Sequence, residues 1–143
     1  MILFYSLLFL SVPWILEATL DLYDTKVNHK TDNHKRDIFT LRIPSFILAS
    51  FFNVLLFPNE FIFVVQFGQS LLLAGGLFFM FFDWAMGIGL KGNPFYLNST
   101  GDAGTSKTDF KLSNFSALTM TGIRVLILAI TLIIYTQLDY TLY

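Results

Sequence analysis

The chain has 143 residues, of which 55% are hydrophobic and 13% charged, with a net charge of −1 and no cysteine. Soluble domains carry about 25% charged residues, so a soluble fold of this size would lack the polar surface to cover itself. A nucleic-acid partner would need a basic face, which this charge balance does not supply, and the lack of cysteine excludes disulfides, thiolate catalysis and zinc–cysteine sites.

Four segments have the length and apolar character of membrane spans, which take about 20 apolar residues in a helix. The first, residues 2–16, reaches that length if its helix continues to Tyr23. The sequence therefore predicts an all-α integral membrane protein, one antiparallel bundle of four transmembrane helices. The expected helices are residues 2–23, 38–57, 61–82 and 115–136, with cytoplasmic loops at residues 24–37 and 83–114.

A signal peptide is the alternative for the first segment, and it needs a positively charged start and a small-x-small cleavage site. No Lys or Arg precedes this apolar run, and "VPWILEA" contains no such site. We therefore expect the segment to be retained as the first helix.

Basic residues are concentrated in two of the three connections between the predicted helices. Lys and Arg in short loops mark the cytoplasmic side of a membrane protein. In and beside the first and third connections lie Lys26, Lys30, Lys35, Arg36, Arg42, Lys91, Lys107 and Lys111. These two connections share a side in a four-helix serpentine, so the sequence predicts a multi-pass membrane protein with both termini outside the cytoplasm. The expected membrane is a bacterial inner membrane.

Acidic side chains gather where the first helix reaches the cytoplasmic face. Glu17, Asp21 and Asp24 have i, i+4, i+7 spacing, which places them in one stripe from membrane depth out to water. A carboxylate at membrane depth is costly unless it is paired. Glu17 should therefore face the bundle interior or a partner, and the simplest partner for Arg42 is Glu17 or Asp83.

Three interpretations of this polar cluster are open. The first is a set of structural ion pairs. The second is a divalent-metal site, because carboxylate oxygen and imidazole are metal ligands. The third is a lipid-headgroup site built on Arg42, Lys91 and neighbouring donors. The candidate polar residues are Glu17, Asp21, Asp24, Arg42, Asp83 and Lys91, and the candidate metal ligands are Glu17, Asp21, Asp83, His29 and His34.

Arg124 lies well inside the fourth apolar segment. At that depth an arginine must snorkel, pair or line a cavity. No acid is expected at a matching depth, so the predicted polar partners are Gln66 and Gln69 of the third helix and Asn53 of the second. A structural polar cluster is favoured over a proton path, which would need acids in mid-membrane.

The segment "GDAGTSKT", residues 101–108, is close to a phosphate-binding loop. Ser106 replaces the glycine that this motif needs before Lys107, and a membrane helix precedes it where the motif needs a strand. An ordinary Gly/Ser/Thr-rich loop is therefore predicted.

Several short pieces resemble small uncharacterised multi-helix membrane proteins of Bacteroidetes-type bacteria and their phages. They are Glu17 with Asp21 after a short first helix, "FDW" at residues 82–84, "GNPFYL" at 92–97 and "TSKTD" at 105–109. The resemblance implies a membrane location and a helix count, and no particular reaction.

The leading functional hypothesis is non-enzymatic: a small membrane protein that binds a partner protein or a lipid headgroup through the polar cluster, alone or as a homo-oligomer. One alternative is a metal-assisted enzyme at the membrane interface that acts on a lipid or headgroup, with a divalent metal as its cofactor. A second is a phage-related holin or exclusion protein, which the nearly uncharged end "TQLDYTLY" disfavours.

Overall fold

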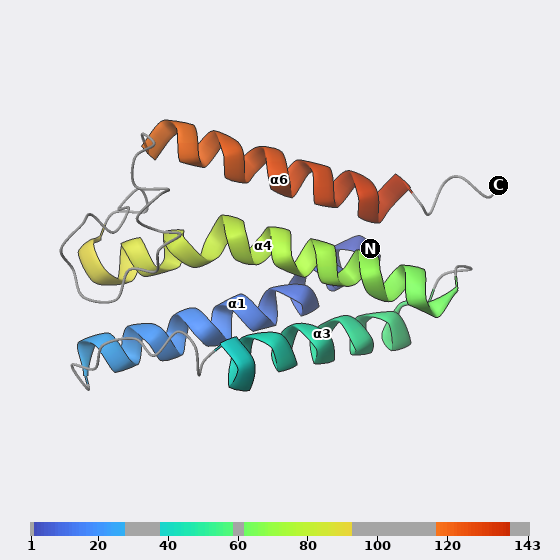
Figure 1. Cartoon of the computed structure of the whole chain (residues 1–143), viewed down its shortest axis with the longest axis horizontal. Coiled ribbons are helices and arrows are strands. Elements are labelled where there is room, and N and C mark those ends of the chain that lie inside the picture. Colours follow the sequence, from blue (N-terminus) through green and yellow to red (C-terminus); the bar gives the residue numbers. More distant parts are fainter. Residues whose placement is uncertain (1, 28–37, 59–61, 93–116, 138–143) are drawn as a thin grey trace.

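The computed structural model of the chain describes residues 2–27, 38–58, 62–92 and 117–137 (Figure 1). These residues form four long helices, and a π-helical turn leads directly into the second. The elements are α1 (Ile2–Lys26), the turn η1 (Ile38–Arg42), α3 (Ile43–Leu56), α4 (Phe63–Lys91) and α6 (Ala117–Gln137). Four helices are long and apolar enough to cross a membrane, so the predicted all-α membrane protein with four spans is confirmed.

The helices run antiparallel in chain order, and α4 is the central one (Figure 1). Helices α1, α3 and α6 all pack against α4, while α1 also packs against α3. Helix α6 lies on the opposite side of α4 from α1 and α3 (Figure 1). A third of the apolar stretch of α4 is buried but only 17% of that of α6. Helix α6 therefore has the largest share of its surface free to face lipid.

One end of the bundle, on the left in Figure 1, holds the ends of α1 and α4 and the beginnings of η1 and α6. We call it the loop end, because residues 28–37 and 93–116 join helices there. The other end, where α1 begins and α6 ends, is the terminal end. Residues 101–108, which carry the sequence close to a phosphate-binding loop, lie outside the described residues.

Helix α4 is longer than the sequence predicted. The apolar run stops at Phe82, but the helix continues to Lys91 and ends at Gly92, whose φ of 67° suits glycine. Close packing accompanies the extension, since a Cβ added to Gly89 would collide with the side chain of Leu22 in α1. Asp83, expected in a loop, is therefore an interior residue of α4.

An apolar core fills the middle of the bundle between its two ends. Leu10 of α1, Ala49 of α3 and Leu73, Ala74 and Leu77 of α4 form this buried cluster. The two alanines let the helix backbones approach closely, as small residues do in membrane interfaces. On the other side of α4, Gly76 lies so close to Thr131 of α6 that an added Cβ would collide with it.

Candidate functional site

The first ion pair of the loop end joins α1 to the start of α3. Glu17 is buried, with 2% of its surface exposed. Nε of Arg42 donates to both carboxylate oxygens of Glu17, at 2.7 and 2.9 Å, and Nη2 of Arg42 also donates to Oε1. The predicted pairing of Arg42 is therefore present, with Glu17 as the partner.

The local backbone explains how Arg42 is presented. Pro44 follows at the start of α3, and a proline removes one helical hydrogen bond and crowds the carbonyl four residues earlier. The chain accommodates this proline with a wider π-helical turn, η1, which ends at Arg42. A proline near the beginning of α3 thus coincides with the turn that carries the guanidinium.

Two aromatic rings of α4 support this guanidinium. The Cζ atom of Arg42 lies 4.5 Å from the ring centroid of Phe78 and 5.9 Å from that of Phe82. The two rings stack on each other with centroids 4.6 Å apart. A cation over an aromatic face gains about 0.5–2 kcal/mol, more when it is desolvated, so α4 stabilises Arg42 without offering it a second charge.

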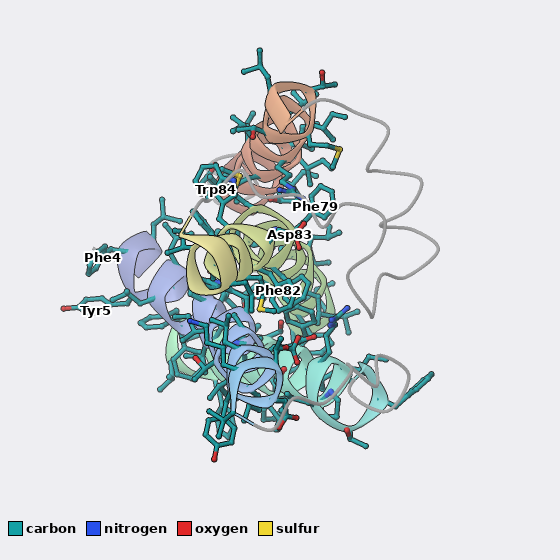
Figure 2. All side chains as sticks on the ribbon, turned by 90° about the vertical axis from the view of Figure 1, so that its left-hand side faces the viewer. Phe4, Tyr5, Phe79, Phe82, Asp83 and Trp84 are labelled. Atoms are coloured by element: carbon teal, nitrogen blue, oxygen red, sulfur yellow. The ribbon has the colours of Figure 1, made fainter. Side chains whose placement is uncertain are left out.

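The second ion pair joins α4 to α6. Nη2 of Arg124 donates to Oδ2 of Asp83, and the Cζ atom of Arg124 lies 5.7 Å from the ring centroid of Phe79. Arg124 is 3% exposed. Figure 2, seen from the loop end, shows Phe79 and Asp83 on the side of α4 that faces α6, and Phe82 below them.

The prediction that Arg124 has no acid at its own depth was wrong. Because α4 continues to Lys91, Asp83 lies about 12 Å inside the helix end, at a rise of 1.5 Å per residue. Arg124 lies at a similar depth, about 10 Å inside the beginning of α6. The antiparallel helices therefore bring the two charges level with each other.

Glu17, Arg42, Asp83 and Arg124 together form what we call the charged layer. Each pair has one buried and one accessible member: the side chains of Glu17 and Arg124 are 2% and 3% exposed, those of Arg42 and Asp83 22% and 45%. The accessible members have opposite charges. The charged layer therefore presents one guanidinium and one carboxylate to its surroundings.

The donors proposed for a metal do not gather into one site. Among the described residues, no group of three or more His, Asp or Glu side chains is placed to hold a metal ion. Glu17 and Asp83 engage different arginines, and His29 and His34 lie outside the described residues, as does the side chain of Lys91. Asp21 and Asp24 lie on α1 and each has an interaction of its own.

The polar residues predicted to meet Arg124 instead bind groups on other helices. Nδ2 of Asn53 donates to Oγ of Ser70 and to the hydroxyl oxygen of Tyr135, both at 3.0 Å, which joins α3, α4 and α6. Nε2 of Gln69 donates to the carbonyl of Ile134 at 3.1 Å. These residues form a second, uncharged polar layer nearer the terminal end.

Gln66 belongs to the same end of the bundle. Its Nε2 is 3.5 Å from the carbonyl of Phe57, the residue that caps α3, so it links the beginning of α4 to the end of α3. The sequence pointed to the amides but not to Tyr135, and the signal that was available is that Tyr135 is the one phenol of α6.

Comparison with protein-family models, with curated proteins and with solved structures found no match. The resemblance to membrane proteins of Bacteroidetes-type bacteria and their phages stays a prediction.

Proposed function

We propose that this small polytopic membrane protein binds the headgroup of a zwitterionic phospholipid, such as phosphoethanolamine, at its charged layer. We also propose that the loop end faces the cytoplasm of a bacterium, since the basic connections join the helices there. The observation that supports the binding is the exposure pattern: Arg42 and Asp83 are accessible, while their partners are buried.

The chemistry of such a headgroup matches the two accessible charges. A phosphate accepts charge-assisted hydrogen bonds from a guanidinium, and an ammonium donates them to a carboxylate. Phe82 is close to both positions, because its ring is 5.9 Å from Cζ of Arg42 and it directly precedes Asp83 in the chain. The phosphate would bind Arg42 and the ammonium would bind Asp83.

The buried partners give the charged layer its selectivity in this proposal. Glu17 and Arg124 hold the accessible side chains in place and bring the layer to zero net charge. An anionic headgroup would pair with the guanidinium of Arg42 but would also lie close to the carboxylate of Asp83. Like charges in a membrane site are unfavourable. A headgroup that carries both charges meets an opposite charge at each position.

The surface of α4 towards the terminal end suits an acyl chain. A Cβ added to Gly68 or Gly75 would meet no atom within 4 Å, so there is open space beside the helix at both positions. These glycines share a helix face with Phe79 and Phe82, given spacings of seven, four and three residues. A lipid bound at the charged layer would lay one chain along this face.

Native mass spectrometry of the protein released from mixed micelles tests the proposal. Phosphatidylethanolamine should be retained in preference to phosphatidylglycerol and phosphatidylcholine, because choline has no N–H to donate. The variant Asp83→Asn should lose the preference over phosphatidylglycerol, whereas Asp24→Asn, also on the loop-end half of the bundle, should keep it. Equal retention of the three lipids by the wild type would leave the four charges as structural ion pairs.

A further inference from the structure

Two buried serines differ from several other hydroxyls of these helices. Ser6 of α1 and Ser50 of α3 are fully buried, and no described group forms a hydrogen bond with either Oγ. Ser11, Thr19 and Thr136 are different, since each donates to the carbonyl four residues earlier. The hydroxyls of Ser6 and Ser50 do not make this local bond.

Asn53 supplies a third buried atom of this kind. Its Nδ2 makes two hydrogen bonds, but its Oδ1 has no described partner, and the residue is 2% exposed. Ser50 precedes Asn53 by three residues, a spacing that puts two side chains on the same face of a helix, one turn apart. The oxygens of Ser50 and Asn53 are therefore neighbours on α3.

The Glu17–Arg42 pair aligns α1 with α3, and this alignment places Ser6 at the same level as Asn53 along the bundle. Ser6 precedes Glu17 by eleven residues and Asn53 follows Arg42 by eleven. Eleven residues make slightly more than three whole turns, so each residue lies on the face that carries its ion-pair member, about 16 Å along the helix. Because α1 and α3 are antiparallel and packed together, Ser6 and Asn53 come level on facing sides.

The core is compatible with this register. Leu10 of α1 and Ala49 of α3 are each seven residues from the ion pair, and both belong to the same buried cluster. Beyond the core, the ring of Tyr5 in α1 stacks on that of Phe57, the residue that follows α3, with centroids 6.4 Å apart. Ser6 and Asn53 lie one further turn in the same direction.

We infer that this place is a binding site for water: at least one buried molecule bonded to Ser6, Ser50 and Asn53, between α1 and α3 and inside the membrane span. Buried water typically makes about three hydrogen bonds to polar groups that otherwise lack partners. Water both donates and accepts, so it suits two hydroxyls and a carbonyl oxygen. A cation fits less well, because the three oxygens are neutral and would leave its charge uncompensated.

Water-edited solid-state NMR on the protein in lipid bilayers tests the site directly. Magnetisation from water should reach the side-chain amide of Asn53 early, as it reaches groups in contact with water, and Ser50→Ala should delay that transfer. Ser11→Ala is the matched control, since the hydroxyl of Ser11 is already bonded to its own helix, and it should leave the transfer unchanged. Absence of early transfer to Asn53 in the wild type would overturn the inference.

A second measurement distinguishes bound water from direct hydrogen bonds and from a cation. Because the bridge needs both serines, Ser6→Ala/Ser50→Ala should lower Tm little more than the worse single variant, and exchange of sodium chloride for choline chloride should leave Tm unchanged. Simply additive losses would mean that the serines do not share a ligand. A rise in Tm that requires sodium or potassium would identify a cation site and contradict the water site.

Discussion

Arg124 is the side chain that this membrane protein can least easily place, because it is buried well inside a spanning helix. A charge at the centre of a spanning helix costs about 2.5–3.5 kcal/mol on insertion scales. Asp83 on α4 neutralises it, and the ring of Phe79 lies against the guanidinium. The free-energy cost of burying Arg124 is therefore offset mainly by one carboxylate, which is itself half-exposed.

Removal of that carboxylate should be more harmful than removal of both charges. Asp83→Ala leaves Arg124 buried and unpaired, and loss of one member of a buried pair costs about 3–5 kcal/mol; the exposure of Asp83 places the expected loss at the lower end. Asp83→Ala/Arg124→Leu should recover most of it, because an apolar residue replaces the charge. Chemical unfolding in detergent measures both, and a double variant less stable than Asp83→Ala would contradict the pairing.

At the scale of elements, α4 organises the bundle. Its Phe78 and Phe82 lie against Arg42, and its Phe79 and Asp83 lie against Arg124. Hydropathy located this helix, but it reports the length of an apolar run and not the length of a helix. The end of α4 was therefore placed too early, and the partner of Arg124 was missed with it.

The Glu17–Arg42 pair could be predicted, since both residues lie near the loop end of their own apolar segments. The contacts of Asn53 and Gln69 could not, because their partners depend on the register between helices. Tyr135, Ser70 and the carbonyl of Ile134 can be assigned as the partners only once α3, α4 and α6 are aligned. The residue types thus identified the polar side chains, but the partners of these side chains depend on how the helices pack.

The contact between α4 and α6 should be sensitive to side-chain size at one glycine. Gly76→Val would place its side chain against Thr131, and overpacking of this kind typically costs about 1–3 kcal/mol. Gly68→Val is the matched control on the same helix, because there is open space beside Gly68. Thermal unfolding should show a clearly larger loss for Gly76→Val, and equal losses would argue against the close approach of α6.

The whole molecule has two polar layers separated by an apolar core. The charged layer lies at the loop end, the uncharged layer lies towards the terminal end, and Leu10, Leu73 and Leu77 lie between them. Helix α6 is tied to α4 in both layers, through Asp83 and Gln69. This arrangement places all the charge of the described spans at the end where the basic connections join the helices.

That arrangement predicts one topology. Because the chain has no cysteine, single cysteines can be introduced at Lys30, Lys107 and Asn59 and labelled with an impermeant reagent. Positions 30 and 107 should react only from the cytoplasmic side, and position 59 only from outside, given the distribution of Lys and Arg. Labelling of positions 30 and 107 from opposite faces would contradict the serpentine.

In the proposed function, the accessible members of the two ion pairs choose the lipid, and one double variant tests this claim most directly. Exchange of the second pair, Asp83→Arg/Arg124→Asp, keeps an ion pair and the net charge but makes both accessible groups cationic. Native mass spectrometry should then show the preference change from phosphatidylethanolamine to the anionic phosphatidylglycerol. A folded exchange variant that retains the preference of the wild type would contradict the claim.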